Sequence, residues 1–139
     1  MTTWCVDANV VIATLVDEAA TSAARSFWDA LRRTDEVIAA QVLYPECAAV
    51  LRRKVVQGLL SESEGREKIE EALDLPITVE TSKQQFRLSF EWALPMRRIR
   101  MHDLMYVAVA KIRDATVVTI DSGMRQAAHE QGVPATLLR

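Results

Sequence analysis

The most constraining feature of the sequence is a β-branched segment near its end, Ala115-Thr-Val-Val-Thr-Ile120, which is followed at once by Asp121. Five consecutive β-branched residues favour an extended strand. An apolar run without polar alternation is typical of a strand that is covered on both faces, as in parallel sheets. Parallel strands need crossover connections, which are usually helices. The segment therefore predicts the central strand of an α/β protein.

Short strands and helices alternate along the rest of the chain. The length of 139 residues predicts one domain, residues 1–139, since a domain holds roughly 100–200 residues. The alternation predicts an α/β fold, a three-layer sandwich with a central, mainly parallel sheet. Besides 115–120, the predicted strands are 4–6, 37–40, 77–79 and 136–138, and the predicted helices are 9–15, 21–33, 45–57, 61–73, 82–94, 104–113 and 122–131.

Several kinds of site are excluded by what the sequence lacks. It has no glycine-rich phosphate loop and no nucleophile elbow, and its two cysteines and two histidines are too scattered for a structural zinc site. Cys5 and Cys47 lie in apolar runs and predict no disulfide framework, so a reduced, cytoplasmic location is expected. We see no signal peptide and no apolar run near the roughly 20 residues of a membrane span, and expect no membrane association.

Four carboxylates occupy positions where the predicted strands end or the helices begin. Asp7 and Asp121 each follow a strand, while Glu46 and Asp103 lie in the first turns of two helices. Ligands of open α/β sheets bind beyond the carboxyl ends of the strands, and helix starts follow strand ends in βα units. We therefore expect all four acids to meet at one edge of the sheet.

Each acid also has a purely structural explanation when it is taken alone. Asp103 and Asp121 fit helix caps or turns, and Glu46 suits the positive end of a helix dipole. Asp7 is harder to explain in this way, because a carboxylate between apolar residues is costly unless it is paired. The coincidence of four such acids is the stronger argument for a functional site.

Clustered carboxylates repel one another, so they either take up protons or bind a cation. Oxygen ligands suit Mg²⁺ or Mn²⁺, which orient phosphodiesters and activate water. The chain has 17 basic and 19 acidic residues, a formal charge of −2. Without the four acids the balance is 17 against 15, or +2, so the remaining surface is mildly basic.

Two basic clusters lie near these acids in the sequence. Arg97, Arg98 and Arg100 immediately precede Asp103, and Arg52-Arg-Lys54 lies two helical turns beyond Glu46. Charge runs are commonly solvated faces, but these two are also candidates for binding phosphate or RNA.

The acids and their surroundings resemble a known family. Val6-Asp7-Ala-Asn9-Val-Val-Ile12 resembles the opening motif of PIN-domain ribonucleases. Glu46, Asp103 in His-Asp-Leu-Met-Tyr-Val-Ala108, and Thr119-Ile-Asp121 match the remaining acids of the family in order. The resemblance spans almost the whole chain, and its length suits the VapC-type toxins of toxin–antitoxin pairs.

The resemblance implies a metal site made of Asp7, Glu46, Asp103 and Asp121, which hydrolyses RNA through a metal-activated water with Mg²⁺ or Mn²⁺ as cofactor. It also implies that Asn9 and Thr119 or Ser122 orient ligands or position water. From the residues alone, a turn explains Asn9 as well as a functional role does, and a strand explains Thr119 equally well. A cognate antitoxin protein and a homodimer are the implied partners.

Two other functions remain as alternatives. A receiver-like phosphoacceptor domain shares an α/β sheet and an acidic pocket, but it needs adjacent acids after the first strand and a late lysine. This chain has the single Asp7, and Asp121 at that late position. A catalytically silent PIN-like interaction module is the second alternative. Its contacts would use Phe86 and Phe90 or Trp28, although such stripes are more commonly core than interface.

Overall fold

A five-stranded sheet, parallel throughout, runs through the computed structural model, which describes residues 1–139. The strand order is β3-β2-β1-β4-β5, so β1 is the middle strand, and β4, whose Val118 lies opposite Val6, is paired on both sides. The strand predicted at 115–120 is confirmed as an interior strand, next to the middle one, and the sheet is entirely parallel rather than mainly so. The strands are β1 (Thr3–Val6), β2 (Glu36–Ala39), β3 (Thr78–Val79), β4 (Thr116–Thr119) and β5 (Ala135–Leu137).

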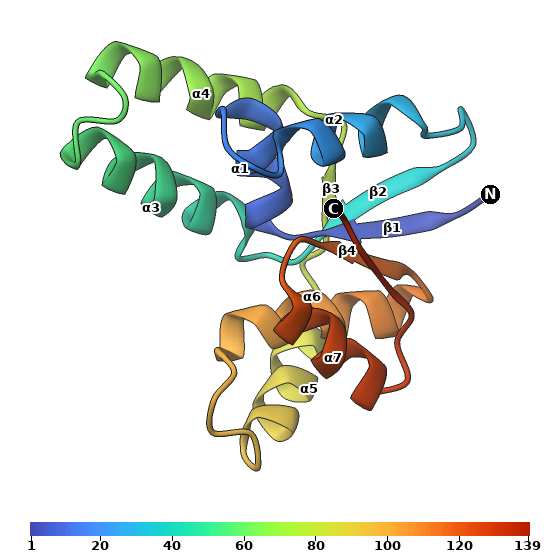
Figure 1. The fold of residues 1–139 in the computed structure, drawn as a ribbon. Helices are drawn as coiled ribbons and strands as arrows, with labels where there is room; N and C mark the ends of the chain where they lie inside the picture. The colour runs from blue at the N-terminus through green and yellow to red at the C-terminus, as the bar shows by residue number, and fades with distance from the viewer.

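Helices cover both faces of the sheet, which confirms the three-layer sandwich. Figure 1 shows the first four helices on one face, with α3 and α4 projecting as a hairpin, and the last three helices on the other. None of the seven helices is long and apolar enough to cross a bilayer. They are α1 (Ala8–Leu15), α2 (Thr21–Asp29), α3 (Leu43–Val56), α4 (Glu62–Asp74), α5 (Lys83–Ala93), α6 (Met101–Arg113) and α7 (Ser122–Glu130).

Local hydrogen bonds explain where two of the helices begin. At the start of α4, the Ser61 hydroxyl accepts from the Glu64 backbone N–H, and the Glu64 carboxylate accepts from the Ser61 N–H. This reciprocal capping satisfies two donors that an uncapped helix would leave free. At the start of α7, the Asp121 carboxylate accepts from the Gly123 N–H at 2.8 Å.

The start of α6 differs from the prediction. The helix begins at Met101 rather than Leu104, so Asp103 lies inside the first turn and is not a cap. Arg100 occupies the cap position, and its side chain makes no capping hydrogen bond. From Leu104 to Ala110 every residue of α6 is buried, as its nearly continuous apolar sequence predicts. Asp103 therefore lies in the first turn of a helix whose following residues are packed in the core.

Helix α5 buries the opposite face from the one its sequence suggests. The prediction that Phe86 and Phe90 belong to the core is wrong, since they are 40% and 51% exposed. Gln85 and Ser89 are buried instead. The Gln85 amide donates to the Glu80 carbonyl at 3.0 Å and accepts from a loop N–H, so its polar atoms are satisfied in the interior. The two aromatic side chains are left on the surface.

A buried glycine and an arginine fix the outer elements to the sheet. Gly65 lies against Val55, and a Cβ at this glycine would stand only 2.7 Å from the valine Cγ2, so the α3–α4 hairpin is packed closely. At the end of α6, Arg113 pairs with Glu36 of β2 at 2.9 Å and with Glu80 just after β3. Both contacts keep elements distant in sequence in fixed positions beside the sheet.

Candidate functional site

The four predicted acids line one hollow at the carboxyl edge of the sheet. Asp7 follows β1 directly, and Asp121 follows β4 by two residues, on strands that are hydrogen-bonded neighbours. Glu46 from the first turn of α3 and Asp103 from the first turn of α6 complete the lining. The hollow measures about 200 Å³, and Asn9 also lies along it. Residues from four distant parts of the chain thus share one small space.

Asp7 is the most deeply fixed of these acids, with an exposed fraction of 2%. One carboxylate oxygen accepts from the Val10 N–H at 3.0 Å, and the other accepts from the Thr119 hydroxyl at 2.8 Å. The Thr119 oxygen in turn accepts from the Asp121 N–H at 3.0 Å. The buried Thr119 hydroxyl therefore joins two of the acids through one atom and sets their relative position.

Glu46 is held by a residue that the sequence analysis did not single out. The Tyr106 hydroxyl donates to Glu46 Oε1 at 2.8 Å, and the tyrosine is 1% exposed. Burial, followed by the Glu46 charge, raises the pKa of Tyr106, so the hydroxyl keeps its proton and remains a donor. Tyr106 is three residues after Asp103 on the same helix, and this i, i+3 spacing on one helix face was the signal that could have revealed it.

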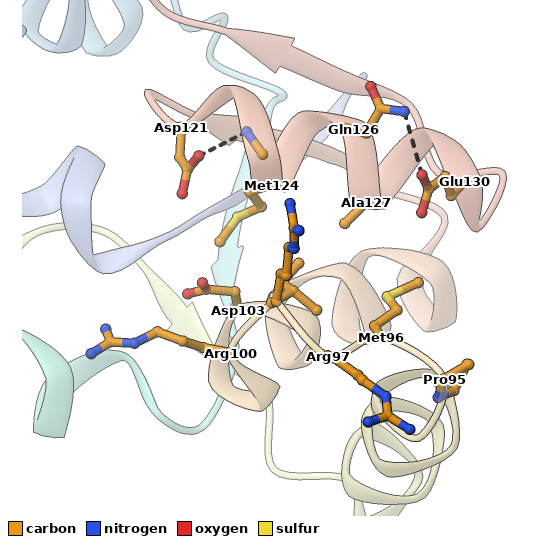
Figure 2. A pocket seen from close by; sticks show the side chains of 13 residues that line it. Pro95, Met96, Arg97, Arg100, Asp103, Asp121, Met124, Gln126, Ala127 and Glu130 are labelled. Atoms are coloured by element: carbon orange, nitrogen blue, oxygen red, sulfur yellow. Dashed lines mark hydrogen bonds between the residues drawn. The ribbon is translucent and has the colours of Figure 1, made fainter.

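Asp103 and Asp121 lie between the hollow and a larger groove beside it. Figure 2 shows their carboxylates near each other, with Asp121 bonded to the backbone N–H of Gly123 at the start of α7. Asp121 therefore combines the capping role allowed by the sequence with a place in the acidic hollow. The carboxylate of Asp103 makes no hydrogen bond and is available to a ligand.

Burial and neighbouring charges raise the pKa values of Asp7 and Asp103. Burial raises the pKa of Asp7 from 3.8 to about 6, against the lowering effect of its hydrogen bonds, and the charges of Asp103 and Asp121 add to the rise. Burial, followed by the charges of Glu46 and Asp121, raises the pKa of Asp103 to about 6. The positive charges of Arg100 and His102 lower the pKa of Asp103 but do not outweigh burial and the neighbouring acids. Carboxylates with raised pKa values cluster at functional sites.

The donor set fits a hard divalent cation. All four candidate ligands are carboxylate oxygens, and Mg²⁺ and Mn²⁺ prefer oxygen and keep several waters. No three His, Cys, Asp or Glu side chains lie close enough to form a closed ligand set. The acids instead surround a space of about 200 Å³, which has room for an ion together with waters. The arrangement suits a cation shared with water and substrate rather than a structural metal.

Basic side chains border the same hollow. Arg53 and Arg100 line it together with the acids. Arg53 is seven residues after Glu46 on α3, which puts both on one face of the helix. Arg97 and Arg98 line the neighbouring groove, whereas the exposed Ser122 lines neither space. An anion bound next to the acids would therefore also lie close to arginine side chains.

The carboxyl edge of this parallel α/β sheet carries four acids, with arginines beside them, around one hollow. This class of site suits a divalent cation together with an anionic ligand. The family model of the PIN domain matches residues 4–130 of the sequence, so the chain belongs to the PIN-domain family. Among curated proteins, no sequence matches significantly.

Solved structures with the same fold include VapC toxins and VapBC complexes. VapC20 of Mycobacterium tuberculosis, described as a sarcin–ricin loop cleaving toxin, is 17% identical with a TM-score of 0.72, over 89% of this chain and 94% of that one. VapBC2 of Rickettsia felis, solved on a promoter DNA fragment, is 11% identical with a TM-score of 0.74, over 99% and 100%. VapBC-1 of nontypeable Haemophilus influenzae is 16% identical with a TM-score of 0.71, over 98% of both chains. These likenesses are of fold.

Proposed function

We propose that this protein is a metal-dependent endoribonuclease of the VapC toxin type, acting in the cytoplasm on RNA phosphodiesters. PIN domains are generally nucleases that use divalent metal ions. The observation that carries the proposal is the single hollow lined by all four acids, with Asp7 and Asp103 at raised pKa values. The receiver-like alternative loses its basis, because the chain belongs to the PIN-domain family.

Asp7, Glu46, Asp103 and Asp121 line the space that would hold the ion, which we propose to be Mg²⁺ or Mn²⁺ bound partly through water. When bound, it supplies Lewis-acid stabilisation of charge on the phosphate and lowers the pKa of a water nucleophile. The protein itself supplies position, because Thr119 fixes one acid with a hydroxyl bond at 2.8 Å. An acid held in one orientation would keep the ion, the water and the phosphate aligned, and such alignment is a large part of catalysis.

The arginines bind the substrate backbone in this proposal. Arg53 and Arg100 lie in the hollow itself, where a phosphodiester would sit beside the acids. Neither forms a salt bridge within the protein, so both guanidinium groups are free to pair with phosphate oxygens. Asn9, at the start of α1, borders the same space and would position the water or the substrate by hydrogen bonding.

A cognate antitoxin and a second copy of the chain are the proposed protein partners. Complexes of toxin with antitoxin are among the structures that share this fold, and this supports an antitoxin that covers the site. The unpartnered apolar surface on and after α5, with Phe86, Phe90 and Leu94 exposed, supports an interface there.

The proposed function is tested with purified protein, a panel of structured RNAs, and Mg²⁺, Mn²⁺ or EDTA. We expect internal cuts with either cation and none in EDTA. Asp103→Asn should lower the cleavage rate roughly 100-fold or more, as when a group that stabilises the transition state is removed. Asp74→Asn is the matched control, because Asp74 is an exposed acid at the end of α4 that does not line the hollow. Equal cleavage by Asp103→Asn and wild type would reject the assigned site.

A further inference from the structure

A groove of about 810 Å³ continues from the acidic hollow along the surface. It shares Arg100, Asp103 and Asp121 with the hollow, so the two spaces are continuous. One wall is the segment of residues 95–100 between α5 and α6, and the other is one face of α7. Figure 2 shows Asp103 and Asp121 at one end and Glu130 at the other. A strand whose phosphate lies at the acids would extend into this groove.

The two walls differ in chemistry. On the loop wall, Arg97, Arg98 and Arg100 are exposed and form no salt bridge within the protein. On the α7 wall, Gln126 and Glu130 line the groove, and the Gln126 amide donates to Glu130 Oε1 at 3.3 Å. One wall therefore offers free positive charge, and the other offers a carboxylate that a neighbouring amide orients.

This difference determines how a nucleotide would lie. A phosphate is attracted to the arginines and repelled by Glu130, so the backbone follows the loop wall and the base turns towards α7. Met96 on the loop wall and the largely buried Met124 on the α7 wall give the groove an apolar, polarisable part that suits contact with an aromatic ring. Contacts with phosphate position a nucleic acid, while contacts with base edges specify its sequence.

We propose that this groove is the base-recognition subsite for the nucleotide next to the cleaved phosphate, and that Glu130 selects guanine there. The proposal rests on the ribonuclease function given above. A carboxylate accepts hydrogen bonds through both oxygens, and the Watson–Crick edge of guanine presents two adjacent donors, N1–H and the N2 amino group. Adenine and cytosine place an acceptor nitrogen beside their amino donor, and uracil has one donor between two acceptors. Gln126 holds one oxygen of Glu130 and so orients this acceptor pair.

The proposal is tested by mapping the cuts that the metal-loaded protein makes in a random-sequence RNA pool. We expect guanine at one position beside the cut, favoured roughly tenfold over adenine, as for a good bidentate contact. Glu130→Gln should remove most of that preference while cleavage continues. Glu67→Gln, at an exposed acid on α4, is the matched control and should leave the preference intact. Arg97→Ala should weaken cleavage of all sequences alike.

A binding measurement separates failure of the subsite from failure of the nuclease. In the Asp7→Asn protein with EDTA, fluorescence anisotropy should show tighter binding of a labelled hexanucleotide with central guanines than of its adenine counterpart. Adding Glu130→Gln should abolish the difference. If wild type cuts RNA but the guanine preference is absent or survives Glu130→Gln, the subsite is overturned and the nuclease stands. If wild type cuts no RNA, guanine-selective binding that depends on Glu130 supports the subsite alone, and its absence overturns both.

Discussion

Replacing Asp7 with asparagine is expected to stabilise the metal-free protein at neutral pH. Burial raises the pKa of Asp7 from 3.8 to about 6, so the folded state binds this proton more tightly than the unfolded chain does. Stability therefore falls as pH rises from about 4 to about 6 and stays low above that range. At about 1.4 kcal/mol per pH unit, the raised pKa lowers the free energy of unfolding, relative to its value in acid, by about 3 kcal/mol at pH 7.5 and about 1 kcal/mol at pH 4.5.

Asparagine removes this cost but alters one hydrogen bond. Its carbonyl oxygen can still accept from the Val10 N–H, whereas its amide must donate to Thr119 in place of the carboxylate that accepted. A mismatch of that kind costs about 1 kcal/mol. The net gain is about 2 kcal/mol at pH 7.5 and close to zero at pH 4.5. For a chain of this length 1 kcal/mol corresponds to roughly 3 °C in Tm, so the expected rise at pH 7.5 is about 6 °C.

Urea unfolding and calorimetry in EDTA at the two pH values measure this effect. Asp74→Asn serves as the control for the loss of an acid at the surface and should change little at either pH. Adding Mg²⁺ should raise the Tm of wild type and not that of Asp7→Asn, because a ligand stabilises the state that binds it. A variant no more stable than wild type at pH 7.5, or one equally stabilised at both pH values, would contradict the argument that burial of this charge strains the fold.

Three further substitutions test other contacts. Tyr106→Phe removes the donor to Glu46 and should lower kcat about 10–100-fold with little change in KM, as measured on a single cleaved RNA. Gly65→Ala should lower the free energy of unfolding by about 1–3 kcal/mol in urea, because its Cβ would stand 2.7 Å from Val55 Cγ2. Arg113→Ala should cost about 1 kcal/mol at low salt and less in 0.5 M NaCl (about 4 Å screening length), because the arginine and its two glutamate partners are partly exposed. An unchanged kcat in Tyr106→Phe would contradict the role given to its hydroxyl. An unchanged urea midpoint in Gly65→Ala would contradict the close packing, and a loss of stability in Arg113→Ala that does not depend on salt would contradict the ion pairs.

The sheet and most helix limits were predictable because their signals are local. The β-branched run before Asp121 identified an interior strand, and the capping pattern at Ser61 located the start of α4 within one residue. The exposed side of α5 was not predictable in this way. Gln85 is buried because it bonds backbone groups of two loops, and those loops meet it only in the folded protein. Apolar spacing alone therefore assigned the wrong face of that helix to the core.

Part of the candidate site could be predicted, and part could not. Strand ends at Asp7 and Asp121 lead to one edge of a parallel sheet from topology alone. The same argument was incomplete for Asp103, because α6 follows helix α5 and not a strand. Asp103 lies at the carboxyl edge of the sheet because residues 94–100 bring the chain back to that edge. No local sequence pattern predicts the path of this loop. The spacing of Tyr106 from Asp103 could have placed it on the same helix face, but its partner, Glu46, is 60 residues away in sequence and no local pattern identifies it.

The position of β4 between β1 and β5 has a consequence for the making of this protein. β1, β2 and β3 lie on one side of β4 in the sheet and precede it in the sequence, so they are synthesised before the strand that carries Thr119 towards Asp7. A nascent chain that has not reached residue 116 lacks the strand that sets Asp7 and Asp121 in place. If the protein cuts RNA as proposed, a chain that has not yet formed β4 is expected to be inactive, because its acids are not yet held together.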